Sequence, residues 1–287
     1  MFKLKSIEFS SYDIKRGIKL PEISENLSEF FGIMFGDGTI LDKGRIHRFG
    51  ISLNLTEDFI YKNYVTNLIT ELFGVEPRVR KRRKEGKFDI EINSKAISRF
   101  LLYLGFPKGK KINKLTTPPW IFNSKKYLRV FLRGLVDTDG SLFFAKRGTY
   151  KLNSYPVIEI KICDKKFIGQ LSSTIKYLGF ECNKNDIKVQ LNGKQNLEKW
   201  QKEIGFKNFN HQSRYLIWEK FKYCIPNTSL KQRMKILKLR WQKGNACNPA
   251  MRITGMSRIA CRARDCETTR NSGFKSPPQL SFVRCKK

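Results

Sequence analysis

Histidine is scarce in this sequence of 287 residues, which contains only His47 and His211. Two histidines exclude nuclease and protease centres that are built from several histidine ligands. No run of 18 uncharged apolar residues occurs, which excludes a membrane-spanning helix. The first residues, MFKLKSIEF, lack the apolar core and the small-residue cleavage site of a secretion signal. We therefore expect a protein of the cytoplasm or of an organelle matrix that is not secreted and contacts no membrane.

Acidic residues are few compared with basic ones. The chain has 25 Asp and Glu against 57 Lys and Arg, which gives a formal net charge of +32. This excess is far larger than solubility needs and indicates a polyanionic partner, most commonly nucleic acid. Apolar residues make up 40% of the chain and 22 residues are Phe, so the sequence can form a core and is not a disordered basic tail.

Cysteine pairs of the C-x-x-C type are absent, although the chain has 7 Cys. Three cysteines lie in sequence of globular character, and we predict them to be small core residues in a reducing compartment: Cys163, Cys182 and Cys224. The other four lie near the end of the chain, where their spacing gives only weak support for a zinc site: Cys247, Cys261, Cys266 and Cys285.

The composition changes near Gly244. Residues 244–287 show no sustained hydrophobic period and carry a net charge of +7, which leaves +25 on residues 1–243. We predict that residues 244–287 form a mostly disordered, basic tail. Such a tail either adds non-specific attraction to phosphates or has no function.

Two segments about 100 residues apart share one pattern. The segments LSEFFGIMFGDGTI (27–40) and YLRVFLRGLVDTDGSL (127–142) each contain an apolar helical run, a glycine and, five residues later, Asp-Gly. Asp37 and Asp139 are 102 residues apart, as are Gly32 and Gly134. A single Asp-Gly pair is usually an ordinary turn. Two of them, each ending an apolar helix within a matching frame, indicate an internal repeat.

The sequence after each motif also matches in order. Each motif leads to an alternating segment, an amphipathic helix, two short strands and a closing helix, with the helices expected at 57–74, 94–106, 165–179 and 196–206. The pattern predicts an α+β fold of two αββαββα repeats with antiparallel sheets. We place the first repeat at 1–110, a linker at 111–126, the second repeat at 127–225 and a C-terminal helix at 226–243. The Pro118-Pro119 pair within the linker breaks any helix.

The paired motif suggests a metal centre. Ser24 is a plausible N-cap for the first motif helix, and the spacing of Gly32 and Gly36 lets another backbone approach closely. If the two motif helices pack on a local two-fold axis, their C-terminal ends bring Asp37 and Asp139 together. The two carboxylates and both helix dipoles then repel each other, and a divalent cation relieves this repulsion. Carboxylate and carbonyl oxygens suit Mg²⁺, which can activate water and polarise a phosphate.

The motifs FFGIMFGDG (30–38) and LRGLVDTDG (132–140) resemble the two motifs of a single-chain LAGLIDADG homing endonuclease. The second motif is close to the family consensus, whereas the first has Phe35 where an acidic residue is common. The acidic residue before the last glycine is present in both copies, as Asp37 and Asp139. The resemblance covers about residues 20–225.

The resemblance implies a monomer that cuts both strands of a long, nearly asymmetric DNA site and leaves staggered ends. It implies Mg²⁺ as cofactor, with Mn²⁺ able to substitute, and an intron as the host of the gene. The metal ligands would be Asp37, Asp139 and the carbonyls of Gly36 and Thr138. Each repeat would place a saddle-shaped antiparallel sheet in the major groove.

The strands carry side chains that suit DNA contact. In each predicted sheet apolar residues alternate with charged or amide residues, so one face packs under the helices and the other is polar. We predict these residues as DNA contacts: Arg45, Arg48, Ser52, Asn54, Arg78, Arg80, Arg82, Lys146, Arg147, Glu159, Lys161, Lys188 and Gln190. The alternative for each of them is a solvated polar strand face.

The family keeps basic or amide groups beside the metals. In the first half, GFPKGKK (105–111) matches the place where a lysine is expected, and we predict Lys110 as catalytic. In the second half the match is ambiguous between Lys207, His211 and Arg214, of which Lys207 is our prediction. A solvated, phosphate-binding lysine is the alternative for these residues. Glu57 and Asp164 start the second helix of each repeat, either as water-ordering residues or as ordinary carboxylates at helix N-termini.

Other functions remain to be weighed. The same scaffold occurs in RNA maturases that bind host intron RNA and in DNA-binding regulators that do not cleave, but binding alone does not require both acidic residues. Self-splicing needs an N-terminal nucleophile and a His-Asn end, whereas this sequence begins Met1-Phe2 and ends Cys285-Lys286-Lys287, so we expect no intein. A purely structural basic protein leaves the doubled Gly/Asp pattern unexplained.

Overall fold

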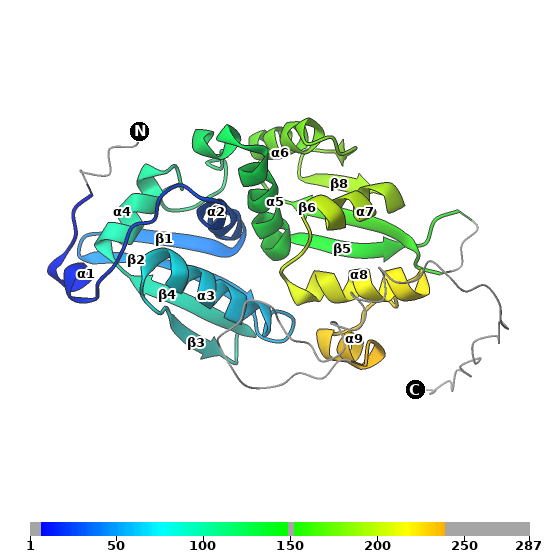
Figure 1. Cartoon of the computed structure of the whole chain (residues 1–287), viewed down its shortest axis with the longest axis horizontal. Coiled ribbons are helices and arrows are strands. Elements are labelled where there is room, and N and C mark those ends of the chain that lie inside the picture. Colours follow the sequence, from blue (N-terminus) through cyan, green and yellow to red (C-terminus); the bar gives the residue numbers. More distant parts are fainter. Residues whose placement is uncertain (1–6, 149–151, 239–287) are drawn as a thin grey trace, which may run out of the picture. The chain divides into compact units, whose positions relative to one another are not determined.

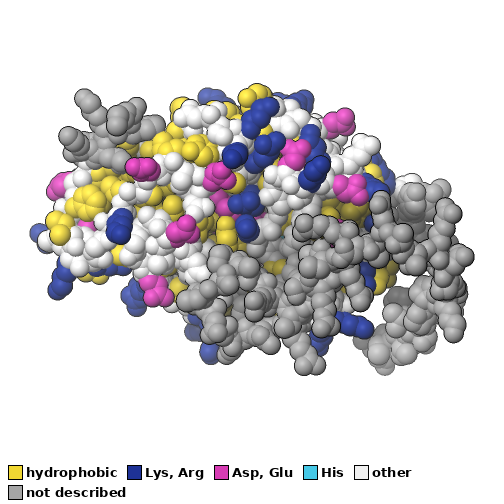
Figure 2. All heavy atoms as spheres, in the orientation of Figure 1, with side chains coloured by type: hydrophobic (Ala, Val, Ile, Leu, Met, Phe, Trp, Pro, Cys, Tyr) yellow, Lys and Arg dark blue, Asp and Glu magenta, His cyan; other side chains and the backbone are white. Residues whose placement is uncertain are grey.

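The computed structural model describes residues 7–148 and 152–238, and the predicted tail 244–287, with its four cysteines, lies outside the described residues. Within the described residues no helix is sufficiently long and apolar to span a bilayer. Basic side chains outnumber acidic ones on the face seen in Figure 2.

The first repeat follows the predicted order of elements. It comprises α2 (Glu25–Asp37), β1 (Gly38–Lys43), β2 (Ile46–Asn54), α3 (Tyr61–Phe73), β3 (Arg78–Arg82), β4 (Lys87–Asn93) and α4 (Lys95–Tyr103). The strands form an antiparallel sheet in the order β1-β2-β4-β3. A short helix, α1 (Ser11–Lys15), precedes the repeat.

The second repeat has the same order and the same sheet topology. It comprises α5 (Lys125–Asp139), β5 (Gly140–Ala145), β6 (Tyr155–Lys161), α6 (Lys165–Tyr177), β7 (Asn183–Lys184), β8 (Lys188–Asn192) and α7 (Lys194–Glu203). Its antiparallel sheet runs β5-β6-β8-β7. The predicted α+β fold of two αββαββα repeats is therefore confirmed (Figure 1).

Additional helices connect and extend the repeats. The 3₁₀ helix η2 (Pro119–Asn123) lies in the linker, with Pro119 at its first position, where a missing N–H costs nothing. Helix α8 (Phe209–Phe221) follows α7, and α9 (Leu230–Ile236) is shorter than the C-terminal helix predicted at 226–243, of which residues 239–243 lie outside the described part.

The motif helices begin where their caps predict. Ser24 accepts a hydrogen bond from the N–H of Leu27 and caps α2, and Ser124 caps α5 by accepting from the N–H of Lys126. Helices α2 and α5 lie side by side between the two sheets (Figure 1). Each motif helix runs directly into the first strand of its sheet, so the end of the helix is fixed to the sheet.

Phe35 joins the cores of the two repeats. It is fully buried, and its ring contacts Phe131 of α5 and Phe167 of α6 at centroid distances of 5.3 and 5.6 Å. The aromatic residue in place of the family's acidic residue therefore packs in the core. Among the predicted core cysteines, Cys224 is buried and Cys182 is half-buried, but Cys163 is exposed, because it lies in the loop between β6 and α6.

Candidate metal-binding and catalytic site

Two glycines set the close contact of the motif helices. A Cβ atom on Gly32 would lie 2.1 Å from the carbonyl oxygen of Phe131, and one on Gly134 would lie 2.3 Å from that of Glu29. One turn further on, a Cβ on Gly36 would lie 2.0 Å from the hydroxyl oxygen of Thr138. Only glycine permits this approach, so the predicted packing is confirmed and the C-terminal ends of α2 and α5 meet.

Asp37 and Asp139 end these two helices and interact electrostatically. Burial raises the pKa of Asp37 to about 7, and the negative charges of Asp139 and Asp58 add to this rise. Surrounding protein also raises the pKa of Asp139, although this side chain reaches solvent. A buried carboxylate whose ionised form is disfavoured by a neighbouring carboxylate provides a site for a cation.

Lys111 supplies a cation at this point. Its ammonium group donates to the carbonyl of Phe35 at 3.0 Å and also contacts the carbonyl of Gly36. Both Asp37 and Asp139 raise the pKa of Lys111, while burial lowers it more strongly. The predicted catalytic residue Lys110 is exposed instead, so the structure brings its neighbour Lys111 to the carboxylates.

The second half places an amide where the first half has an ammonium group. The Asn208 side chain donates to the carbonyl of Asp137 at 2.8 Å, near the end of α5, and to the Asp58 carboxylate at 2.8 Å. Asp137 is buried, and one of its carboxylate oxygens accepts from the backbone N–H of Lys207 at 2.7 Å. The two halves of the site are therefore chemically different.

The three candidates for a basic residue in the second half lie elsewhere. The Lys207 side chain is exposed and its ammonium group lies 5.7 Å from the centre of the Tyr64 ring. His211 is buried against Phe206, and burial together with Arg214 and Arg233 lowers its pKa to about 3, so it is neutral. Arg214 itself is half-buried and donates to Asn210 of its own helix. None of these three side chains has a recorded contact with Asp37 or Asp139 within the described part of the chain.

Glu57 and Asp164 have structural roles. Glu57 pairs with the buried Arg233 of α9 at 2.7 Å and accepts from the N–H of Leu230. Asp164 caps α6 and accepts from the N–H of Leu115 in the linker at 3.2 Å. The carboxylate that acts on Asp37 from this region is Asp58, next to Glu57.

The predicted metal ligands fit a divalent cation. The ammonium group of Lys111 already occupies a cation position on the carbonyls at the end of α2, including that of Gly36, and the charges of Asp37 and Asp139 both act on it. Over the described ranges no group of three or more His, Cys, Asp or Glu side chains could hold a metal ion. A metal would therefore depend on Asp37 and Asp139 with the carbonyls of Gly36 and Thr138, and with ligands from substrate or water.

The polar face of the first sheet is basic but internally paired. Arg48 and Arg80 pair with Glu91 at 3.2 and 3.5 Å, and Arg82 pairs with Asp89. Ser52 also donates to Asp89, whereas Asn54 accepts from the backbone of the turn that follows β2. Arg78 shares this face through its register with Glu91, and Arg45 is exposed in the β1–β2 turn.

The second sheet has a less basic polar face. Lys188 and Gln190 both donate to Glu159, at 3.1 and 2.6 Å. Lys161 is exposed opposite Lys188. Lys146 and Arg147 are exposed after β5, and the Arg147 guanidinium lies 4.3 Å from the centre of the Tyr155 ring. The predicted contacts lie on the polar faces or in adjoining turns, and their role in DNA binding stays a prediction.

Comparison with known proteins gives two sets of similarities. No family model matches the chain. It is 26% identical over 216 residues to a DNA polymerase of Thermococcus hydrothermalis, a match that covers 71% of this chain but 12% of the polymerase. It is also 26% identical over 189 residues to the tRNA-splicing ligase RtcB of Pyrococcus abyssi, covering 56% of this chain and 19% of the ligase. The chain thus spans a small part of the curated relatives it matches.

Solved structures similar to this chain include LAGLIDADG homing endonucleases. I-SmaMI bound to cleaved DNA is 14% identical with a TM-score of 0.46, covering 71% of this chain and 90% of that one. I-DmoI in complex with DNA and Mn is 16% identical with a TM-score of 0.44, covering 64% of this chain and 98% of that one. I-SmaMI has also been solved on an uncleaved DNA target with calcium ions, at 14% identity and a TM-score of 0.48, covering 76% of this chain and 98% of that one.

Sequence reasoning missed three residues of the site, which are Lys111, Asp58 and Asn208. Each lies within one residue of a position that the sequence did single out, namely Lys110, Glu57 and Lys207. The sequence therefore identified the correct segments but not the correct residues within them. Which side chain points to the site depends on the backbone of the turn that carries it.

Proposed function

We propose that this protein is a site-specific DNA endonuclease of the LAGLIDADG type, encoded within an intron, that hydrolyses both strands as a monomer with Mg²⁺. One observation carries the proposal: Asp37 and Asp139, which are 102 residues apart in sequence, act on each other electrostatically at the contact of two glycine-packed helices. The charge of the chain supports a polyanionic substrate.

The residues have distinct roles in this proposal. Asp37, Asp139 and the carbonyls of Gly36 and Thr138 would hold Mg²⁺, which when bound activates water and polarises the scissile phosphate. Lys111 places a positive charge beside both carboxylates and stabilises the negative charge that develops on the phosphate. Asn208 holds Asp58 and the end of α5 in place without adding charge.

The basic faces of the two sheets would position the duplex. Arginines suit bidentate contact with guanine, and the lysines and amides suit phosphates and other base edges. Ion pairs with Glu91 keep Arg48 and Arg80 of the first sheet in defined orientations before DNA binds. Since binding neutralises several phosphates, affinity should fall about 10³-fold or more between 50 and 200 mM salt.

The test is cleavage mapping. Purified full-length protein is incubated with a library of randomised duplexes and Mg²⁺, and the new ends are sequenced. On the site found, Asp37→Asn and Asp139→Asn should abolish cutting and retain duplex binding. Asp186→Asn, which removes an exposed aspartate paired with Lys165, is the matched control and should cut normally.

Two results would contradict the proposal. Normal cutting by both Asp37→Asn and Asp139→Asn would show that the hydrolytic centre lies elsewhere. Tight binding to one duplex sequence without cutting by the wild type, with Mg²⁺ or Mn²⁺, would favour the non-cleaving DNA-binding regulator instead. Mn²⁺ in place of Mg²⁺ should support cutting if the ligands are oxygen atoms.

A further inference from the structure

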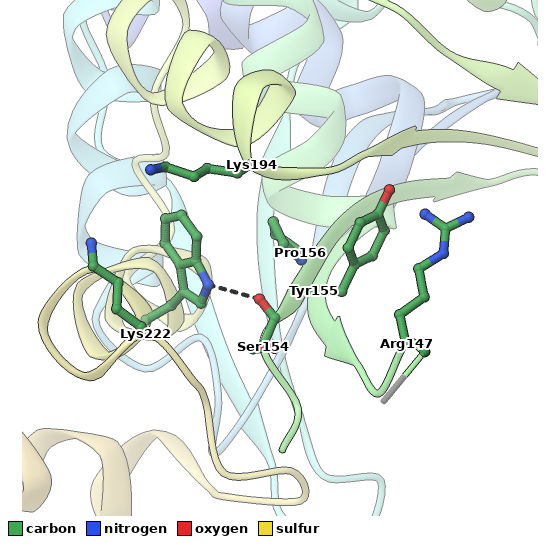
Figure 3. A pocket seen from close by; sticks show the side chains of 8 residues that line it. Arg147, Ser154, Tyr155, Pro156, Lys194 and Lys222 are labelled. Atoms are coloured by element: carbon green, nitrogen blue, oxygen red, sulfur yellow. Dashed lines mark hydrogen bonds between the residues drawn. The ribbon is translucent and has the colours of Figure 1, made fainter. Parts of the chain in front are cut away.

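A cavity of about 500 Å³ lies at the end of the second sheet, apart from the carboxylates (Figure 3). Its lining includes two aromatic side chains, Tyr155 and Trp218, and Pro156, which follows Tyr155 in β6. Strand β6 begins at Tyr155, and Trp218 belongs to α8. The volume is within the range of small-ligand sites in proteins.

The indole ring of Trp218 is held in place. The indole N–H of Trp218 donates to the carbonyl of Ser154 at 2.9 Å, as the dashed line in Figure 3 shows. The same indole stacks on Phe144, with centroids 5.9 Å apart and planes 20° apart. Trp218 is thus a buried, fixed wall of the cavity, and the half-buried Tyr155 is the ring that a planar ligand can reach.

Each ring is faced by a cation. The Arg147 guanidinium lies 4.3 Å from the Tyr155 centroid, and the Lys222 ammonium lies 5.4 Å from the Trp218 centroid. Lys194 adds a third positive charge at the rim. Its ammonium group lies 3.7 Å from the carboxylate of Glu198, and both side chains are exposed. Among the described residues that line the cavity, none is acidic. The cavity therefore combines flat apolar surfaces with positive charge that no carboxylate of its described lining opposes.

The place of the cavity separates it from the proposed cleavage centre. Strand β5 starts at Gly140, next to Asp139, and ends at Ala145, which pairs with Tyr155. Five residues of strand span about 17 Å. The cavity thus lies at the outer end of the second sheet, where a polynucleotide that followed the sheet away from Asp139 would leave the protein.

We propose that this cavity binds one unpaired nucleotide of a single-stranded polynucleotide. The base stacks on the half-buried ring of Tyr155, and the positive charges of Arg147, Lys194 and Lys222 around the rim attract the phosphates of the strand. Stacking tolerates any base, because every base has a π-face, and aromatic platforms with basic rims are how proteins hold single strands. Bases within a duplex are already stacked, so this site is additional to duplex binding by the sheets.

The test measures binding of the full-length protein to fluorescein-labelled 12-nucleotide single strands of DNA and of RNA. Tyr155→Leu keeps bulk and removes the π-face, and Lys222→Gln removes one charge. Each should weaken single-strand binding, Tyr155→Leu by about tenfold. Neither should change binding to a 30-bp duplex. Tyr177→Leu and Lys125→Gln are matched controls, because they alter an exposed cation–aromatic pair, 4.9 Å apart, outside the cavity.

Cross-linking provides a readout that does not depend on a variant that folds. Wild-type protein irradiated with a single strand that carries 5-iodouracil should cross-link within the segment 152–161. If Tyr155→Leu loses tenfold in affinity for the DNA strand alone, or for the RNA strand alone, that strand is the polynucleotide that the cavity binds. Three results would overturn the proposal. Tyr155→Leu and Tyr177→Leu could weaken single-strand binding equally, or Tyr155→Leu could weaken duplex binding as much as single-strand binding. Thymidine monophosphate could also compete as well as the 12-nucleotide strand.

Discussion

The ammonium group of Lys111 donates a hydrogen bond to the backbone carbonyl of Phe35, at 3.0 Å and across 76 residues of sequence. The carbonyl belongs to the last turn of α2, where the helix dipole is negative, and the two carboxylates of the site act on the same ammonium group. A linker residue thus completes the charge balance of the centre.

Substitution of Lys111 should therefore affect catalysis more than binding. Lys111→Gln is expected to reduce the rate of cleavage by about 10²- to 10³-fold, since it removes a positioned charge from the transition state. Duplex affinity should stay within about threefold, because one of many basic groups is lost. Single-turnover kinetics and a binding titration separate the two effects. Lys110→Gln, one residue away and exposed, is the control and should behave as wild type.

The repulsion at the two carboxylates should appear as lost stability. Burial, Asp139 and Asp58 raise the pKa of the Asp37 carboxyl group to about 7, so its ionised form destabilises the fold at pH 8. Asp37→Asn removes this charge and should stabilise the fold at pH 8 by about 1–4 kcal/mol. Mg²⁺ at 100 times its Kd should raise the Tm of the wild type by about 5 °C or more and leave Asp37→Asn almost unchanged. Thermal unfolding at several Mg²⁺ concentrations measures both effects. A variant that is less stable than wild type without Mg²⁺ would contradict this account.

The helix contact depends on the absence of side chains at two positions. Gly32→Ala or Gly134→Ala should destabilise the protein by about 3 kcal/mol or more, since the added Cβ would meet a backbone carbonyl within 2.3 Å. Gly169→Ala is the matched control in α6, where the nearest atom to a Cβ would be 4.0 Å away. It should stabilise by about 1 kcal/mol, because alanine is the better helix former. Urea unfolding of the three variants decides the point.

A buried ion pair links the same helices. Glu29 of α2 is 1% exposed and accepts from Nε of Arg133 of α5 at 3.0 Å, and Arg133 also donates to the carbonyl of Ile204. Removal of either charge alone, by Glu29→Leu or Arg133→Met, should cost about 3–5 kcal/mol, because the partner is left buried and unpaired. The double variant should recover most of this loss. Additive losses in the double-mutant cycle would show that the two residues are not coupled.

Acid should destabilise the fold through His211. Its folded-state pKa is lowered to about 3 from an ordinary value of 6.5 by burial and by Arg214 and Arg233. The unfolded chain therefore binds the proton first, and stability falls as the pH drops from about 6.5 towards 3, by at most about 1.4 kcal/mol per pH unit. Denaturant unfolding between pH 4.5 and 7 should give a flatter profile for His211→Gln than for wild type.

Much of the fold could be predicted because the same sequence pattern occurs twice and each part of it indicates a helix or a strand. The 102-residue spacing of Asp37 and Asp139 and the alternation of strands such as β2 follow from periodicity, and Ser24 follows from cap chemistry. The exact site could not be predicted, because Lys110 and Lys111 are chemically identical. Their orientation depends on the turn that contains Gly109, whose φ of +76° no pattern in the sequence encodes. Likewise, the exposure of Cys163 follows from the length of β6, which ends at Lys161.

The ion pair between Arg233 and Glu57 has a consequence for protein engineering. Arg233 follows the second repeat but is fully buried, and it bonds Glu57 of the first repeat and Ser213 of α8. Chimeras that exchange whole repeats between related chains at the linker would separate these partners and leave the Arg233 guanidinium buried without its carboxylate. Recombinants of this chain should therefore exchange α9 together with the loop that carries Glu57, as a single non-contiguous module.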